Sequence, residues 1–149
     1  MKARYLIIGI VFVFLLTSSS TCCDQCDGGH KYITIINNTS EDIVCQRKWK
    51  GIITPEDTLF DCRVACFLIK SSNLEKNESA NDCWEIDFRA IPYIQFFVLD
   101  AKKYFEYLDI PGNIPCDTVR KYMPTLQRYQ LTLEELERMN WTVTYPPEK

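Results

Sequence analysis

The sequence predicts an α+β fold, namely a single domain with a mostly antiparallel, sandwich-like β-sheet and two or three short helices. Three observations lead to this prediction. Runs of β-branched and aromatic residues are short and are separated by turn-forming residues. Two segments carry signals for the start of a helix. The chain has 149 residues, 46% hydrophobic and 25% charged, which is the composition of one folded domain.

The first half of the predicted domain contains a hairpin, a third apolar run and a loop. Residues 32–36 (YITII) and 43–49 (IVCQRKW) are strand-like, and residues 37–42 between them are turn formers, which predicts a hairpin. Residues 64–69 form the third apolar run. Residues 71–82 are polar and are expected to form a mobile loop.

The middle of the chain predicts two more strands and a helix. Residues 84–90 alternate between apolar and polar side chains, which indicates a half-buried strand, and residues 94–99 indicate a more fully buried one. Asp100 can cap the helix that follows. The expected apolar stripe of this helix has the spacing i, i+3, i+4, i+7 and consists of Ala101, Tyr104, Phe105 and Leu108.

The last part of the chain contains the clearest signals. Residues 117–122 indicate a helical turn, and residues 126–131 indicate a strand. Thr132 and Glu135 then have the spacing of a capping box. The helix that they start has one apolar face, formed by Leu133, Leu136 and Met139, and Asn140 can end it. Residues 141–145 alternate as a final strand, which two prolines stop.

Residues 1–21 have the pattern of a secretory signal. Lys2 and Arg4 form a positive start, residues 6–16 form an unbroken apolar run, and residues 17–21 are small and polar. As a helix the run spans about 16 Å, whereas the hydrocarbon core of a bilayer is about 30 Å thick. We therefore expect the segment to be cleaved rather than kept as a transmembrane anchor.

The rest of the chain divides into three expected parts. Residues 22–31, which include two adjacent glycines, are expected to be a flexible tether. Residues 32–146 are expected to form the single β-rich domain, and residues 147–149 a short tail. Disulfides would add to the stability of a domain of this size.

Cys22 directly follows the predicted leader, where bacterial lipoproteins are cleaved and acylated. Ser19 stands at the position where the cleavage motif of such proteins has leucine, and Leu16 lies further back. The residues alone therefore fit two interpretations equally. Either Cys22 carries a lipid, or an ordinary signal peptide happens to precede a cysteine.

The charge of the chain argues against nucleic-acid binding. Cleavage after residue 21 removes two basic residues and no acidic one, which leaves 15 basic against 20 acidic residues, a net charge of −5. Nucleic-acid binding requires basic surface that neutralises phosphate. The sequence also lacks the glycine patterns of nucleotide-binding loops and the zinc-protease motif, so we expect no cofactor and no metal.

The remaining cysteines are candidates for disulfides if the chain enters an oxidising compartment. They are Cys23, Cys26, Cys45, Cys62, Cys66, Cys83 and Cys116. Their pairing stays open, since even six cysteines allow fifteen connectivities. The Cys23–Cys26 pair also has the spacing of a redox motif and, with His30, of part of a zinc site, but it precedes the first predicted strand.

We expect no catalytic residue in this chain. His30 is the only histidine, so a serine or cysteine hydrolase would have to use it from a flexible segment. The many carboxylates show no pairing that marks a glycosidase. The aromatic residues concentrated in 93–107 are expected in the core, and any exposed ones would form a binding face for a protein or glycan. The candidates for that face are Tyr93, Phe97, Tyr104 and Tyr107.

Several segments resemble a group of small uncharacterised Bacteroidetes proteins that carry a signal or lipoprotein leader. The group ends in an RYxLSLEDLxxLxWTxxYP-like segment, to which residues 117–121 (DTVRK), 126–136 (LQRYQLTLEEL) and 140–146 (NWTVTYP) are similar. Residues 32–39 (YITIINNT) and 97–101 (FVLDA) also resemble the group. The resemblance implies a cell-envelope lipoprotein and names no catalytic residue.

These inferences lead to one expected function and two alternatives. The chain is expected to be an exported cell-envelope protein, a lipoprotein anchored through Cys22 in the outer membrane or periplasm, with a non-enzymatic binding or structural role. The first alternative is a secreted, disulfide-stabilised ligand-binding module without a lipid anchor. The second is an envelope enzyme with thiol-redox or hydrolytic activity.

Overall fold

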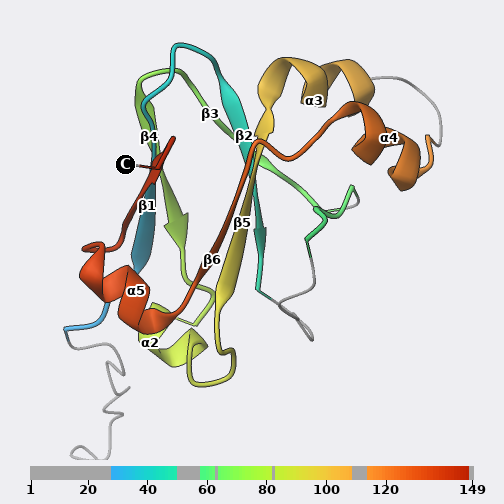
Figure 1. The fold of residues 1–149 in the computed structure, drawn as a ribbon. Helices are drawn as coiled ribbons and strands as arrows, with labels where there is room; N and C mark the ends of the chain where they lie inside the picture. The colour runs from blue at the N-terminus through green and yellow to red at the C-terminus, as the bar shows by residue number, and fades with distance from the viewer. Residues whose placement is uncertain (1–27, 50–57, 63, 82, 109–113, 148–149) are drawn as a thin grey trace, which may run out of the picture.

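A computed structural model describes residues 28–49, 58–62, 64–81, 83–108 and 114–147. Within these residues the chain forms seven strands and four helices in two mostly antiparallel sheets, which confirms the predicted α+β class. Figure 1 shows three layers: a three-stranded sheet, a four-stranded sheet, and two helices beyond the larger sheet. No helix in the described part of the chain is long and apolar enough to cross a bilayer.

The three-stranded sheet has the order β4-β1-β7. Its central strand, β1 (Tyr32–Asn37), pairs antiparallel with β4 (Asn73–Glu78) and parallel with β7 (Thr142–Tyr145). Ile33 and Ile35 point into the protein and alternate with more exposed residues, as expected for a strand with one buried face. The strand predicted at the start of the domain is thus confirmed.

The four-stranded sheet has the order β3-β2-β5-β6 and is antiparallel throughout. Its strands are β2 (Ile43–Lys48), β3 (Phe67–Ile69), β5 (Ile94–Asp100) and β6 (Gln127–Leu131). β5 is buried on both faces, because one face meets the smaller sheet and the other meets the helices. The more fully buried strand predicted over residues 94–99 is thus confirmed.

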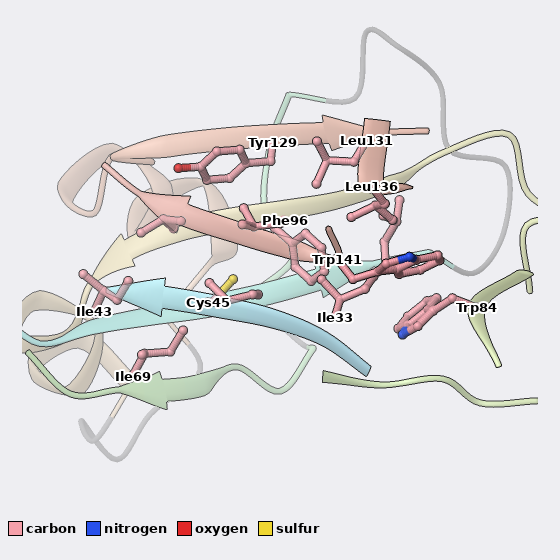
Figure 2. Close-up of a cluster of buried hydrophobic side chains, with 14 residues drawn as sticks. Ile33, Ile43, Cys45, Ile69, Trp84, Phe96, Tyr129, Leu131, Leu136 and Trp141 are labelled. Carbon is pink, nitrogen blue, oxygen red and sulfur yellow. The ribbon is translucent and has the colours of Figure 1, made fainter. Parts of the chain in front are cut away.

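The main hydrophobic core fills the space between the two sheets (Figure 2). Trp84 and Trp141 lie at one end of this core, and Ile43 and Ile69 lie at the other. Its remaining fully buried members include Ile33, Ile35, Cys45, Ile94, Phe96, Val98, Leu136 and Val143. Alternate residues of β1, β2, β5 and β6 contribute, as expected for two sheets packed face to face, whereas the edge strand β4 contributes none.

A second core lies on the opposite face of the four-stranded sheet. Helices α3 (Ala101–Leu108) and α4 (Cys116–Tyr122) pack there. Phe97 of β5 and Val119 and Met123 of the α4 region are each at most 2% exposed in this core. The larger sheet is therefore the middle layer of the domain.

Helix α5 (Leu133–Arg138) confirms the predicted capping box. The Thr132 hydroxyl accepts the Glu135 backbone N–H at 3.3 Å, and the Glu135 carboxylate accepts the Thr132 backbone N–H at 2.8 Å. These bonds satisfy donors that a helix start leaves unpaired. After α5, Asn140 has a φ of 48°, and this left-handed residue turns the chain into β7.

The strand predicted over residues 84–90 is wrong, since Trp84–Asp87 form a short helix, α2. Its buried residues are Trp84 and Asp87, which have the helical i, i+3 spacing. The buried Asp87 carboxylate accepts hydrogen bonds from the Ser79 hydroxyl at 2.8 Å and the Ala80 backbone at 3.2 Å. These side-chain bonds fix a compact turn, which the apolar and polar alternation alone could not reveal.

The predicted hairpin and the predicted mobile loop are also wrong. β1 and β2 belong to different sheets, so residues 38–42 cross from one sheet to the other. Residues 73–78 of the expected loop form β4, an edge strand that pairs along its whole length with β1. Its side chains are mostly exposed and polar, so the sequence of β4 has no apolar pattern that would predict a strand. The charged residues on this edge strand discourage pairing with a further strand.

Candidate binding groove beside helix α3

A hollow of about 400 Å³ lies between helix α3, the edge of the four-stranded sheet and loop 38–42, and we call it the α3 groove. Its lining comes from loop 38–42, from β3, from the last residue of β5 and from α3, and consists of Ser40, Glu41, Asp42, Leu68, Asp100, Ala101, Lys102 and Phe105. Two of these residues are large and apolar yet exposed: Leu68 at 39% and Phe105 at 44%. Acidic residues surround them.

Asn37 holds the loop that forms one wall of the α3 groove. Its side chain is fully buried, and its amide nitrogen donates to the backbone carbonyls of Glu41 at 2.8 Å and of Ile69 and Lys70 at 3.2 Å each. Its amide oxygen accepts the Thr39 hydroxyl at 2.7 Å. One buried amide therefore ties the loop to β3, which carries Leu68.

Asp42 and Asp100 connect the same wall to neighbouring elements. The Asp42 carboxylate accepts the backbone N–H of Ser71 at 2.7 Å, and the Asp42 carbonyl accepts that of Ala101 at 3.3 Å. The Asp100 carboxylate accepts the Lys103 backbone N–H at 2.9 Å, which confirms the predicted cap of this helix. The position of both carboxylates is thus fixed by the backbone.

Sequence reasoning placed Phe105 in the buried stripe of this helix, and that assignment is wrong. The residues of α3 that pack on the sheet are Ala101, Tyr104 and Tyr107, so the buried face is rotated away from Phe105. Leu68 belongs to the third apolar run of the sequence, but β3 is an edge strand, so this side chain remains 39% exposed. Neither residue stood among the predicted binding residues.

The four residues predicted for an aromatic binding face are buried or half-buried. Phe97 is 0% exposed and belongs to the second core, while Tyr104 and Tyr107 pack against that core and Tyr93 is half-buried. Phe97 is buried because β5 is covered on both faces. The exposed aromatic ring in this region is Phe105, which neighbours Tyr104 edge to face at 5.4 Å between ring centroids.

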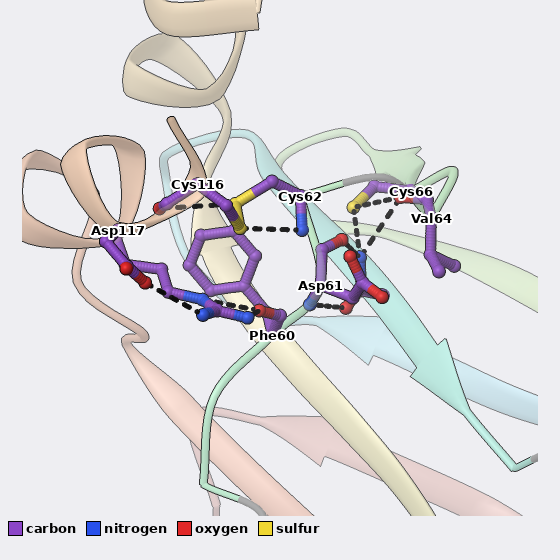
Figure 3. Close-up of a disulfide and its surroundings, with 9 residues drawn as sticks. Phe60, Asp61, Cys62, Val64, Cys66, Cys116 and Asp117 are labelled. Atoms are coloured by element: carbon purple, nitrogen blue, oxygen red, sulfur yellow. Dashed lines mark hydrogen bonds and ion pairs between the residues drawn. A yellow bond between two sulfur atoms is a disulfide. The ribbon is translucent and has the colours of Figure 1, made fainter. Parts of the chain in front are cut away.

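Of the predicted disulfide cysteines, Cys62 and Cys116 are joined to each other across 54 residues of sequence (Figure 3). This bond links the segment before β3 to the start of α4. Cys83 is disulfide-bonded as well. The predicted lipidation site Cys22 and the candidates Cys23 and Cys26 lie outside the described residues.

Cys45 and Cys66 are free cysteines and not the bridged ones expected from the sequence. They lie on opposite faces of the larger sheet, since Cys45 packs in the main core and Cys66 against the second core. Burial raises the pKa of both thiols. Because the thiolate is the reactive form, both groups are poor nucleophiles.

His30, assigned to the tether from its sequence, lies on the domain at the end opposite the α3 groove. Its ring stacks on Trp141 at 4.3 Å, and its Nδ1 lies 2.7 Å from the Glu85 carboxylate. The His30 backbone N–H also donates to Glu85, and the His30 carbonyl accepts from Trp84. This arrangement clamps the incoming chain onto the sandwich.

Gly29 passes close to Cys83 in the same clamp. A Cβ atom at Gly29 would lie 3.0 Å from the Cys83 sulfur, so a larger residue there would push the chain away.

The described residues contain no group of three or more metal-ligating side chains placed around a common point.

We expect the substitution Glu85→Gln to remove part of the pH dependence of stability. Burial raises the pKa of Glu85, but hydrogen bonds from the His30 ring and backbone outweigh it and lower the pKa below its ordinary value. Such a carboxyl stabilises the fold above its unfolded pKa of about 4.3 and loses this contribution as the pH falls through its folded pKa.

Glu85→Gln should therefore lower the free energy of unfolding by about 1 kcal/mol at pH 7, and the difference from the wild type should shrink below about pH 4. Urea denaturation at several pH values measures both quantities. Glu75→Gln, at an exposed position of β4, is the control and should match the wild type throughout. A loss independent of pH would contradict the role given to this carboxylate.

Two other hollows offer less to a ligand. One, of about 450 Å³, is lined by Tyr129 and β7, but Tyr129 is 8% exposed and its hydroxyl already donates to the Thr144 carbonyl at 2.6 Å. The other, of about 420 Å³, lies beside the disulfide, where the Arg120 guanidinium donates to the Phe60 carbonyl and contacts Asp117. In the first hollow the Tyr129 hydroxyl, and in the second the Arg120 guanidinium, already has a partner within the protein.

Comparison of the chain with protein-family models, with curated proteins and with solved structures finds no match.

Proposed function

We propose that this chain is an exported, lipid-anchored binding module without enzymatic activity, which holds its partner in the α3 groove. The observation that carries this proposal is the exposure of Leu68 and Phe105 in one hollow edged with carboxylates. Large apolar side chains gathered in an exposed hollow are typical of interaction sites.

The disulfide between Cys62 and Cys116 supports export. Disulfides form and persist in oxidising compartments and are rare in the cytosol. The pattern of residues 1–21 supports the same route, and Cys22 directly after it supports an acylated N-terminus.

The position of the α3 groove suits a protein held by its N-terminus. In Figure 1 the chain enters the domain at the end that carries α2 and α5, whereas loop 38–42 and α3 lie at the other end. The six residues of β1 separate the two ends by about 20 Å. An anchor at Cys22 would therefore present the groove away from the membrane.

A binding role is favoured over thiol-redox chemistry by the two free thiols of the described residues. Burial raises their pKa, so both remain protonated near neutral pH. The His30 ring, which a hydrolase would need, is engaged by Trp141 and Glu85 in holding the chain to the domain.

Labelling with radioactive palmitate in bacteria that express the full chain tests the anchor. We expect the label on the wild type and on Cys23→Ala, its loss in Cys22→Ala, and accumulation of precursor with globomycin. Label that persists in Cys22→Ala would contradict the assigned position. A wild type that is unlabelled and released with an oxidised Cys62–Cys116 bond would contradict the anchor and favour the secreted module.

A further inference from the structure

We infer that the α3 groove binds a cationic segment of a partner protein, in which an arginine or lysine stands next to an apolar residue. This inference rests on the proposed binding function and names the chemistry of the occupant. It follows from the charge of the groove, from its apolar surface and from the way its carboxylates are held.

The lining of the α3 groove is acidic. Glu41, Asp42 and Asp100 face one basic residue, Lys102. Among the described residues the Glu41 carboxylate has no hydrogen-bond or ion-pair partner, and Asp42 and Asp100 each use one oxygen on a backbone N–H. Carboxylate oxygens therefore remain for a ligand, and they attract a cation and repel phosphate or an anionic membrane surface.

The apolar part of the α3 groove selects a side chain rather than a bare ion. An arginine placed over the Phe105 ring gains a cation–π contact while its guanidinium forms paired bonds with a carboxylate. Leu68 offers a contact for an apolar neighbour of that arginine. A hollow of about 400 Å³ accommodates a few side chains, which suits a short segment.

A divalent metal ion fits this lining less well than an organic cation. Calcium requires six to eight converging oxygen ligands. Two of the three carboxylates here are each held by a backbone N–H, and the described residues show no metal-binding cluster. The fixed carboxylates instead suit an arginine or lysine side chain, whose N–H groups donate hydrogen bonds to them.

Isothermal titration with an acetylated, amidated peptide of alternating arginine and leucine tests this inference on the purified mature chain. We expect binding that weakens when NaCl is raised from about 0.05 to about 0.5 M. Phe105→Ser and Glu41→Lys should each weaken it by about tenfold. Leu126→Ser is the matched control, because Leu126 is also 44% exposed and does not line the groove, and it should bind like the wild type.

NMR chemical-shift mapping locates the peptide, with perturbations expected in loop 38–42, β3 and the first turn of α3. Both groove positions are exposed, so unchanged thermal unfolding of the two variants shows that the fold is kept. Equal binding by wild type and Phe105→Ser, or shifts elsewhere, would overturn the inference.

A peptide of alternating glutamate and leucine separates the failure of this inference from that of the proposed function. If it bound in a manner that depends on Phe105, the groove would remain a binding site and the cationic occupant would be wrong. If neither peptide bound, the inference would fail. The palmitate labelling would still test the lipid anchor of the proposed function independently.

Discussion

Replacing Asn37 with aspartate is expected to lower the free energy of unfolding by about 4 kcal/mol at pH 7. The Asn37 amide nitrogen faces the carbonyls of Glu41, Ile69 and Lys70 at a position with no solvent exposure. A carboxylate there loses these donors, buries a charge and repels the three oxygens. Urea denaturation measures the loss, which is a large part of the stability of an ordinary domain.

Asn38→Asp is the matched control for this substitution, because Asn38 is the next residue and is exposed. It should change stability by less than about 0.5 kcal/mol. Burial also favours a neutral carboxyl group at position 37, so the destabilisation should grow as the pH rises through the raised folded pKa. Equal effects of the two substitutions on the free energy of unfolding, or a loss that does not depend on pH, would show that the buried Asn37 amide does not hold loop 38–42 in place.

Removing the disulfide with Cys62→Ala and Cys116→Ala together is expected to cost about 4 kcal/mol for a closed loop of this length, since the unfolded chain gains entropy. The bond spans 54 residues and connects the segment before β3 to α4. Urea denaturation without reductant gives the cost. Cys66→Ala, which removes a free thiol in the same region, should cost less than about 2 kcal/mol.

The disulfide prediction can fail in a recognisable way. If the double variant and Cys66→Ala had the same stability, the bond would be absent from the purified protein or would constrain nothing. Mass spectrometry of the alkylated protein before and after reduction distinguishes these cases, because the wild type should expose two more thiols for this bond on reduction.

The parts of the fold that the sequence predicts well are those fixed by local chemistry. The capping box at Thr132 and Glu135 needs only residues three apart, and residues 94–99 are mostly apolar because β5 has neighbours on both faces. β4 was missed because it is held by backbone pairing to β1 and exposes polar side chains. The α2 turn was missed because the Asp87 carboxylate, rather than apolar periodicity, organises it.

The α3 groove could not be predicted from the sequence for a related reason. The exposure of Phe105 depends on how Ala101 and Tyr104 seat the helix on the larger sheet, and the exposure of Leu68 depends on β3 lying at an edge. The cysteine pairing likewise depends on which segments meet in space. Cys45 of β2 packs in the main core, whereas Cys66, just before β3, packs against the second core, and this becomes evident only when β2 has its partners.

The central place of β1 has a mechanical consequence. A partner pulling at loop 38–42 against an anchor before residue 28 would load β1 lengthwise, because the strand runs from one end of the domain to the other. Its hydrogen bonds to β4 on one side and to β7 on the other would then carry the force in shear, all at once, rather than opening one after another. The pairing of β1 on both sides would thus let the domain resist a force applied along this strand.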